Sequence, residues 1–213
     1  MKTAMIGATG RTGRHALTTA LDRGHDVKVL VRNPERLAED VRQRVDIVVG
    51  DSTDPSALAT LLDGVDAVLS ALGPSQKQPD LHTRTAHELA ALMRVTGPRR
   101  FVGVSGAGID VPGDEEARRD KVISWLINAL GGDVVKDKPA EYKVWADSGL
   151  DWTLVRPPRL VEGPATGRLE HDAHRSTQST RIHCADLGTF LVDILEGDLY
   201  VQKAPFVATT RGA

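Results

Sequence analysis

Short apolar segments alternate with longer amphipathic stretches along the whole chain. Six segments are apolar almost without interruption, which is typical of strands covered by helices on both faces of a parallel sheet. They span residues 3–6, 27–31, 45–49, 67–70, 101–104 and 152–155. Between them, apolar residues recur with helical spacing, which predicts helices over 12–23, 55–62, 80–95, 115–130 and 139–147.

This alternation predicts an α/β protein with a doubly wound parallel sheet, the Rossmann fold, because parallel strands are joined by right-handed helical crossovers. A last helix is expected at about 184–195 and a short strand near 205–208. The segments 73–80 and 156–174 are expected to be loops, since they are rich in proline, glycine and charged residues. We expect a single domain over 1–213, with a small C-terminal substrate lobe built mainly from about 106–150 and 156–183.

The composition sets the broad class of protein. Of 213 residues, 27 are basic and 29 acidic, so the formal net charge is −2, which argues against nucleic acid or a membrane surface as partner. A chain of this length buries roughly 70% of its unfolded surface and needs no disulfide or metal. The single cysteine, Cys184, and the lack of a signal peptide or long apolar run favour the cytoplasm. We expect a monomer or a weak homodimer.

Three glycines follow the first predicted strand with the spacing Gly7-x-x-Gly10-x-x-Gly13, and a predicted helix begins at Thr12. A strand, a glycine loop and a helix together form the context in which this spacing indicates a dinucleotide site. Gly7 allows the tight turn, Gly10 lets the backbone approach a pyrophosphate, and Gly13 lets the helix pack closely on the strand. The N-terminus of that helix faces the anion. An ordinary glycine-rich turn between strand and helix is the plainer alternative.

Arg32 ends the second predicted strand, where NAD-binding folds usually carry an acidic residue that holds the ribose 2′-hydroxyl. A guanidinium at this position matches a 2′-phosphate through bidentate, charge-assisted hydrogen bonds. Arg36 follows one helical turn later, and Arg11 lies inside the glycine loop. The pattern predicts NADP rather than NAD. Each arginine also fits a solvated surface position, which for Arg36 taken alone is the favoured interpretation.

Ligands of open α/β sheets bind beyond the carboxyl ends of the strands, so the residues that follow the other predicted strands are candidates. Asp51 and Ser52 follow the third strand and are expected beside the adenine, although Asp51 also fits a turn and helix cap before Pro55. The residues expected beside the ribose and pyrophosphate are Ala71, Leu72 and Gly73. Ser105 ends the fifth strand, where its hydroxyl is a candidate for orienting a substrate or the nicotinamide carboxamide; satisfying the local backbone is the alternative.

Several segments together resemble the atypical short-chain dehydrogenase/reductase group: GATGRTG, GHDVKVLVRNPERL, GVDAVLSALG, FVGVSGAG and SGLDWTLVRPPRLVEGPATG. Within that group, the chain is most similar to biliverdin reductase B/flavin reductase-like and NmrA-like NAD(P)-binding proteins, over nearly its whole length. The resemblance implies an NADPH-binding Rossmann fold that often reduces flavins or related conjugated substrates. It implies that the cofactor is lined by Gly7, Thr9, Gly10, Arg11, Thr12, Gly13, Arg32, Asp51, Leu72, Gly73, Ser105 and the stretch Arg156, Pro157 and Pro158.

The chain departs from the superfamily at its catalytic dyad. The usual Tyr-x-x-x-Lys is absent, because Ala146 stands four residues after Tyr142. Lys138 precedes Tyr142 by four residues and shares its helical face in reversed order, so the two are candidates for polarising a substrate. A surface pair at this spacing is the favoured alternative. Hydride transfer to a planar acceptor needs mainly orientation and a dry site, so the missing dyad suits flavin reduction better than alcohol oxidation.

Arg159 stands where the biliverdin reductase-like proteins carry a histidine, which favours an anionic substrate; a surface arginine in a mobile loop is equally open. Trp125 and Tyr142 are candidates for walling a planar substrate, although both fit a core as well. His171 and His174 lack a third ligand-bearing partner, so we predict no metal site. The remaining histidines are interpreted as surface or helix-face residues: His15, His25, His82, His87 and His183.

These patterns predict an NADPH-dependent oxidoreductase that transfers hydride to a planar acceptor such as a flavin, a quinone or a related conjugated small molecule. Ser105, Tyr142 and Lys138 are the candidate catalytic residues, and Arg159, Trp125 and Tyr142 the candidate substrate contacts. Two alternatives stay open: a non-catalytic NADP(H) redox sensor of NmrA type, and an epimerase, isomerase or dehydratase acting on a pathway intermediate. A small-molecule substrate is expected, with no nucleic-acid or membrane partner.

Overall fold

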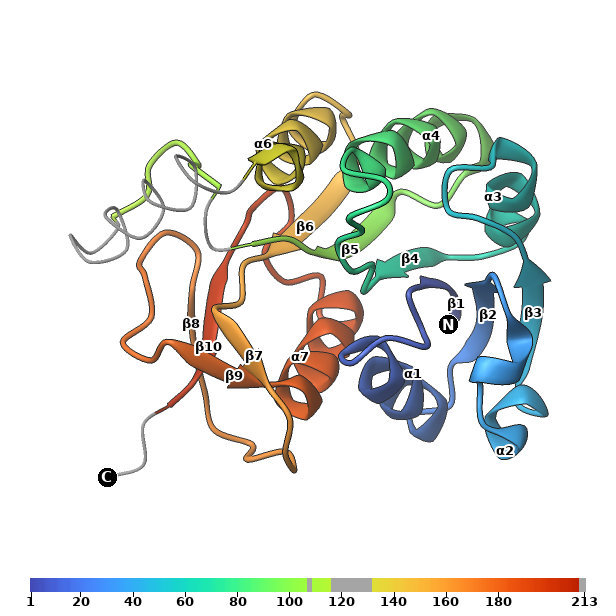
Figure 1. Ribbon diagram of the computed structural model, residues 1–213, viewed down its shortest axis with the longest axis horizontal. Coiled ribbons are helices and arrows are strands. Elements are labelled where there is room, and N and C mark those ends of the chain that lie inside the picture. The colour runs from blue at the N-terminus through green and yellow to red at the C-terminus, as the bar shows by residue number, and fades with distance from the viewer. Residues whose placement is uncertain (107–108, 116–131, 211–213) are drawn as a thin grey trace.

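Six parallel strands form the central sheet of the computed structural model, which describes residues 1–106, 109–115 and 132–210 (Figure 1). Their spatial order is β3-β2-β1-β4-β5-β6, which confirms the predicted doubly wound fold. The strands are β1 Lys2–Ile6, β2 Asp26–Val31, β3 Val45–Val49, β4 Ala67–Ser70, β5 Arg100–Val104 and β6 Asp151–Val155. Each lies within one residue of its predicted bounds, because strands buried on both faces carry a continuous apolar signal.

Helices cover both faces of the sheet, with α1 and α7 on one face and α3, α4 and α6 on the other (Figure 1). Their bounds are α1 Gly13–Asp22, α3 Pro55–Leu62, α4 Leu81–Thr96, α6 Gly132–Ala146 and α7 Cys184–Glu196, with short turns η1 Pro34–Arg36 and α2 Glu39–Arg42 after β2. The predicted helix at 115–130 lies, apart from its first residue, outside the described residues. The helix predicted over 139–147 begins earlier, at Gly132, so Pro139 lies inside α6.

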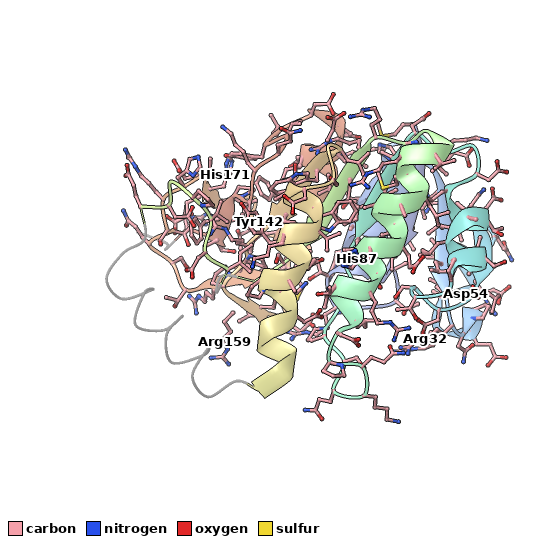
Figure 2. All side chains as sticks on the ribbon, turned by 90° about the horizontal axis from the view of Figure 1, so that it is seen from above. Arg32, Asp54, His87, Tyr142, Arg159 and His171 are labelled. Carbon is pink, nitrogen blue, oxygen red and sulfur yellow. The ribbon has the colours of Figure 1, made fainter. Side chains whose placement is uncertain are left out.

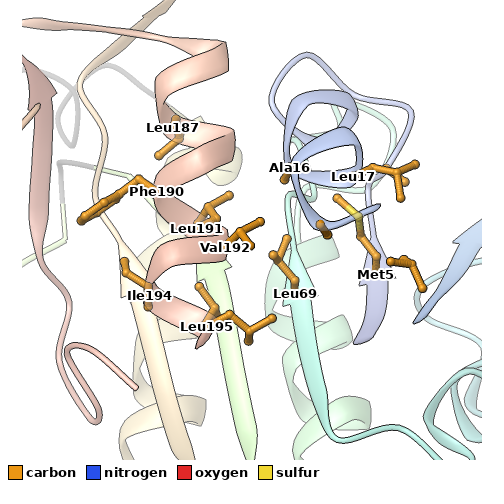
Figure 3. Close-up of a cluster of buried hydrophobic side chains, with 14 of the residues drawn as sticks. Met5, Ala16, Leu17, Leu69, Leu187, Phe190, Leu191, Val192, Ile194 and Leu195 are labelled. Atoms are coloured by element: carbon orange, nitrogen blue, oxygen red, sulfur yellow. The ribbon is translucent and has the colours of Figure 1, made fainter. Parts of the chain in front are cut away.

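Two apolar cores separate the sheet from its helices. Met5 faces α1 and α7, whereas its neighbours Ala4 and Ile6 face α3, α4 and α6. Figure 3 shows the first core, in which α7 and α1 lie side by side over the sheet. Gly188 of α7 makes this approach possible, because a Cβ there would lie 2.7 Å from the backbone nitrogen of Ala16. A helix from the end of the chain is thereby packed against the helix that follows the glycine loop.

Two small ribbons stand beside the main sheet. Strand β7 (Arg159–Val161) pairs in parallel with β9 (Arg181–His183), and β8 (Leu169–Asp172) pairs antiparallel with β10 (Phe206–Thr209). The expectation of a loop over 156–174 is therefore wrong, since it holds β7 and β8. Each is too short and too polar for a recognisable period, and each finds its partner strand at a distance in the sequence. The short final strand was predicted.

A buried carboxylate anchors the loop between these ribbons. Asp186, at the start of α7, accepts hydrogen bonds from the backbone N–H groups of Thr166 and Gly167 and from the Thr166 hydroxyl. Thr209 of β10 donates a further bond to the same carboxylate. The ribbons are thus attached to α7, and α7 in turn to α1. Across the described stretches of the chain, none of the helices is both long and apolar enough to cross a lipid bilayer.

Candidate functional site

A cleft of about 290 Å³ opens at the carboxyl edge of the sheet, beyond the ends of β1 to β4. This is where the strand order reverses, between β1 and β4, and where open α/β sheets bind ligands. Most of the predicted cofactor residues line it together: Gly7, Thr9, Gly10, Arg32, Arg36, Asp51, Ser52, Ala71, Leu72 and Gly73. They come from four different strand ends, and the parallel register brings those ends to one edge.

The glycine loop forms the floor of the cleft. Gly7 has a φ of +79°, and a Cβ there would lie 2.5 Å from the carbonyl oxygen of Ala71. A Cβ on Gly13 would lie 2.0 Å from the carbonyl oxygen of Gly7, so the first turn of α1 packs directly on the loop. Gly10 donates its N–H to that same carbonyl at 3.0 Å. The backbone therefore leaves open space in front of the N-terminus of α1, as a pyrophosphate requires.

Two arginines enter the cleft from the turn after β2. Arg32 and Arg36 both line it, and within the described chain neither guanidinium has a carboxylate partner. The side chain of Asn33 accepts the N–H of Glu35 at 2.9 Å and holds the turn that carries Arg36. Figure 2 shows Arg32 at the same edge of the molecule as Arg159 and the loop that precedes α4. Unpaired guanidinium groups at this edge suit a phosphate.

Asp51 is turned onto its own loop rather than toward these arginines. Its carboxylate accepts hydrogen bonds from the N–H and the hydroxyl of Thr53 at 3.0 and 2.9 Å. The helix cap before Pro55 is Asp54, which accepts the N–H of Ser56, so the cap suggested for Asp51 lies three residues further on. Asp51 still lines the cleft, beside Ser52.

Arg11 does not line the cleft, contrary to the expectation that it faces the cofactor. Its guanidinium binds the carboxylate of Glu162 at 2.8 Å and the carbonyl of Leu160 at 3.2 Å, so it reaches toward β7. The hydrogen bond with Glu162 raises the pKa of Arg11 and lowers the pKa of Glu162. This exposed ion pair links the glycine loop to the strand that begins the C-terminal ribbons. Nothing in the sequence showed that Arg11 binds Glu162, because the two residues are far apart along the chain.

Two buried hydroxyls, one at the start of α1 and one after β5, have no hydrogen-bond partner within the part of the chain that the structure describes. Ser105, directly after β5, donates its N–H to the carbonyl of Val155 at 2.8 Å, but its Oγ has no hydrogen-bond partner and its side chain is buried. Thr12, at the N-terminus of α1, is buried and its Oγ1 is also unpartnered. Buried polar atoms are almost always hydrogen-bonded, so these two are exceptions. Neither residue lines the cleft.

Lys138 lies at the centre of a buried polar cluster rather than in the expected surface pair. Its ammonium donates to the carbonyl of Val104 at 3.0 Å, to Glu141 at 2.9 Å and to Nδ1 of His82 at 2.8 Å. These bonds use all three N–H donors that an ammonium possesses. The cluster joins β5, α6 and the first turn of α4. The surface-pair expectation is wrong because the second partner comes from a helix more than fifty residues away.

The buried carboxylate of Glu141 is kept ionised by this arrangement. Burial raises the pKa of Glu141, but the attraction of Lys138, together with the His82 ring 3.8 Å away, outweighs it, and the net pKa is lowered. Asp137 adds a second buried carboxylate, which accepts the backbone N–H groups of His82 and Thr83, each at 2.9 Å. Asp137 therefore caps the N-terminus of α4 from the neighbouring helix, in the favourable orientation for a helix dipole.

The sequence and fold comparisons agree with this geometry. The family model described as NAD(P)H-binding matches residues 7–198. The chain belongs to the NAD(P)H-binding family. The resemblance to NAD(P)-binding proteins is thus confirmed, and the family binds a nicotinamide cofactor.

Relatives include proteins with and without a described activity. The uncharacterized protein YwnB of Bacillus subtilis is 31% identical over 51% of this chain, which spans about half (48%) of that protein. A structure from Burkholderia pseudomallei, described as an exported protein, is 30% identical with a TM-score of 0.77 over 98% of this chain and 99% of its own. A proposed NADH–flavin reductase from Streptococcus pneumoniae is 25% identical, with a TM-score of 0.76 over 99% of this chain and all of its own.

Tyr142 is not polarised by Lys138, in contrast to the dyad of the wider superfamily. None of the described contacts joins the two side chains, and the Tyr142 ring packs edge-on against Trp152 at 5.8 Å between centroids. Burial raises the pKa of Tyr142. Arg156 acts in the opposite direction, but Asp114 and Asp147 raise the pKa further, so the phenol keeps its proton. The direction is opposite to that produced by a neighbouring lysine in Tyr-x-x-x-Lys.

Arg156 is structural, which corrects the expectation that its stretch lines the cofactor. The side chain is fully buried and binds Asp114 through both terminal nitrogens, at 2.6 and 2.9 Å. It also donates to the carbonyls of Ala204 and Ile109 and lies over the Phe206 ring at 3.6 Å. Four of its five N–H donors are bonded within the protein, and the side chain has no exposed surface from which to reach a ligand. Pro157, which follows, is buried and does not line the cleft.

The predicted substrate and metal-site residues do not come together in one place. Arg159 is exposed at the start of β7, and Trp125 lies outside the described residues. Nδ1 of His171 bonds the Tyr200 hydroxyl at 2.6 Å, whereas His174 lies 3.7 Å from Asp114. Within the described ranges no group of three or more potential ligands is arranged to hold a metal ion.

The sequence did not reveal every residue of the site. Further cleft residues are Ile6, Leu30, Val31, Gly50, Pro74, Ser75, Gln78 and Leu81. The loop at 73–80 stood out by composition, and its place after β4 was the available signal for Pro74, Ser75 and Gln78. His82 was interpreted as a surface or helix-face residue but is 4% exposed. No local sequence pattern reveals that His82 is buried, because its partner Lys138 lies on a different helix far along the chain.

We expect Glu141→Gln to destabilise the protein at pH 7 by about 3–5 kcal/mol, since it leaves the partly buried Lys138 ammonium without its counter-charge. A carboxyl whose folded pKa is lowered stabilises the fold above its unfolded pKa, about 4.3, and loses this contribution as the pH falls through the folded value. The difference from the native protein should therefore shrink in acid. Urea unfolding at a series of pH values measures it, and a difference that stays constant down to pH 3 contradicts this role.

Proposed function

We propose that the protein is an NADPH-dependent reductase that transfers hydride to a planar acceptor such as a flavin, a quinone or a related conjugated molecule. The observation that carries the choice of cofactor is the pair Arg32 and Arg36, which line the same cleft as the glycine loop without a carboxylate partner in the described chain. A 2′-phosphate supplies the missing negative charge, and the ribose hydroxyl of NAD does not. The flavin reductase described for Streptococcus pneumoniae supports the choice of acceptor.

Each part of the cleft has a role in holding the cofactor. Gly7 and Gly10, with the N-terminus of α1, would bind the pyrophosphate, and Arg32 with Arg36 the 2′-phosphate. Asp51 and Ser52 would flank the adenine, while Ala71, Leu72 and Gly73 would flank the ribose. Ser105 would donate to the carboxamide or acceptor. The nicotinamide, when bound, supplies the hydride, and the protein supplies orientation and exclusion of water.

The buried cluster favours reduction of a conjugated acceptor over alcohol chemistry. All three N–H groups of Lys138 are already bonded, and Tyr142 has no lysine to lower its pKa. A residue that must take a proton from an alcohol in each turnover needs a pKa close to the working pH, and burial moves the pKa of Tyr142 further from it. A conjugated acceptor stacked on the nicotinamide needs less from the protein, because charge delocalises over its own ring system.

Two exposed arginines point to an anionic acceptor. Arg159 and Arg181 are register partners on β7 and β9, so their side chains share one face of the ribbon. Directly opposed like charges are unfavourable, and the described chain offers neither of them a carboxylate. Figure 2 shows Arg159 at the same edge as Arg32, so an acceptor beside the cofactor could reach it. We place the substrate lobe at this ribbon and over about 106–150, as the sequence suggested, in a reducing compartment such as the cytoplasm.

The function is tested by oxidation of NADPH in the presence of FMN, riboflavin or a quinone. We expect turnover with at least one acceptor, and about tenfold lower kcat/KM for Ser105→Ala, in line with the loss of one hydrogen bond of about 1.4 kcal/mol. Because Ser105 Oγ has no partner among the described residues, this variant should keep the native melting temperature. Micromolar NADPH binding without turnover of any acceptor would contradict the reductase proposal and favour the redox sensor.

Cofactor choice is tested by Arg32→Glu. The substitution should weaken NADPH roughly 10- to 100-fold and leave NADH nearly unchanged, because it replaces a charge-assisted hydrogen bond of about 1.5–3 kcal/mol with repulsion. Fluorescence titration with both cofactors measures the two affinities, and Arg36→Glu serves as the matched variant on the same turn. Equal losses for NADPH and NADH would show that Arg32 does not discriminate.

The anionic acceptor is tested with FMN and riboflavin, which differ by one phosphate. We expect Arg159→Ala to raise the KM for FMN about fivefold to tenfold, which corresponds to the loss of one exposed hydrogen bond to a charged group. The KM for riboflavin should stay unchanged. Arg168→Ala, an exposed arginine of the connecting loop, is the control. The same KM change for both flavins would count against an anion site at Arg159.

A further inference from the structure

Glu162 lies at the junction between the glycine loop and the C-terminal ribbons. It directly follows β7, and its carboxylate accepts hydrogen bonds from two guanidinium groups, Oε1 from Arg11 at 2.8 Å and Oε2 from Arg14 at 2.7 Å. The thiol of Cys184, the first residue of α7, lies 3.9 Å from the same Oε1. One carboxylate thus contacts the glycine loop, the first turn of α1 and the start of α7.

Arg11 holds the backbone of β7 as well. Its guanidinium donates to the carbonyl of Leu160, in the middle of the strand, at 3.2 Å. Strand β7 has only three residues, and Arg159 at its start donates its N–H to the carbonyl of Thr180 beside β9. A short strand that is paired along its length moves as one piece, so a displacement of Arg11 reaches the whole ribbon formed by β7 and β9.

On its other side, Arg11 is attached to the part of the glycine loop that faces the cleft. The preceding residue, Gly10, lines the cleft, and its N–H is bonded to the carbonyl of Gly7, which lines the cleft as well. A loop of this kind binds phosphate through backbone N–H groups. A nucleotide that orders this backbone therefore also fixes the origin of the Arg11 side chain, which reaches toward β7.

Strand β7 joins this contact to the place assigned to the acceptor. Arg159 is exposed at the start of the strand, and Glu162 comes directly after its end. The ion pair itself is open to solvent, since the side chains of Arg11 and Glu162 are 55% and 49% exposed. Exposed ion pairs add little to stability, so this contact matters more for the position of β7 than for holding the fold together.

We propose that Glu162 is a positioning residue that transmits cofactor binding at the glycine loop to the ribbon formed by β7 and β9. Arg11 and Arg14 hold Glu162, and β7 then presents Arg159 to the acceptor. The place of the acceptor rests on the proposed function, whereas transmission from the loop to the ribbon needs only the cofactor binding of the family. By linkage, cofactor and acceptor strengthen each other's binding by the same factor.

Amide hydrogen exchange tests the transmission without an acceptor. We expect saturating NADP⁺ to slow exchange in the peptides that contain β7 and β9 about fivefold in the native protein. In Glu162→Gln the effect should disappear, because an amide nitrogen then faces one of the two guanidinium groups. Asp193→Asn is the matched control, since Asp193 pairs with Arg23 at the other end of α1 and is similarly exposed. Each variant should lower the melting temperature by at most about 4 °C.

FMN binding tests the acceptor side, with flavin fluorescence as the measurement. In the native protein and in Asp193→Asn, saturating NADP⁺ should tighten FMN binding about fivefold or more, and FMN should tighten NADP⁺ binding by the same factor. In Glu162→Gln both factors should fall to about one, while NADP⁺ alone binds as it does to the native protein, because Glu162 does not line the cleft.

This role of Glu162 is overturned if NADP⁺ protects the ribbon equally in the native protein and in Glu162→Gln, or protects it in neither. It is also overturned if FMN binds the native protein equally with and without NADP⁺. Equal losses in Glu162→Gln and Asp193→Asn would likewise contradict it, because they report a general loosening around α1. A native protein that binds NADP⁺ but no flavin contradicts the proposed acceptor instead, and hydrogen exchange then still decides the role of Glu162.

Discussion

A Cβ on Gly7 would lie 2.5 Å from the carbonyl oxygen of Ala71, and one on Gly13 would lie 2.0 Å from the carbonyl oxygen of Gly7. These approaches press the end of β1, the start of α1 and the end of β4 against one another through backbone alone. The cleft exists because no side chain occupies this junction. The unsatisfied N-terminus of α1 therefore faces the cleft, and the strand ends that carry Arg32, Asp51 and Leu72 surround it.

The far side of the same edge is organised by charge rather than by close packing. Two buried carboxylates of α6, Glu141 and Asp137, and the partly buried Lys138 secure β5 and the start of α4. Removing ions from water is costly, and a core of apolar residues would serve stability as well. The gain is geometric, since hydrogen bonds fix directions that dispersion forces do not. The ring of His82 and the strand end at Ser105 are held in one arrangement as a result.

Most of the fold could be predicted because its signals are local. Strands covered on both faces read as continuous apolar runs, and Pro55 with Asp54 defines the start of α3 within the sequence itself. The ribbons formed by β7 to β10 escaped in part, since a three-residue strand such as β7 has no period and gains its hydrogen bonds only from β9. In the same way, Arg11 and Arg156 carried no sign of whether their partner is a ligand or a carboxylate of the protein.

By itself, the sequence determined the doubly wound sheet, the glycine loop and the strand ends that line the cleft, because each depends on residues close together in the chain. Only the tertiary structure decided which polar side chains are free to bind a ligand and which are hydrogen-bonded within the protein. Arg156 is hydrogen-bonded to Asp114 and Arg11 to Glu162, while Lys138 donates to three partners from three elements. Ser105 and His82 keep an unused atom. The physical reason is that hydrogen-bond satisfaction depends on atoms that approach one another only after the chain has folded.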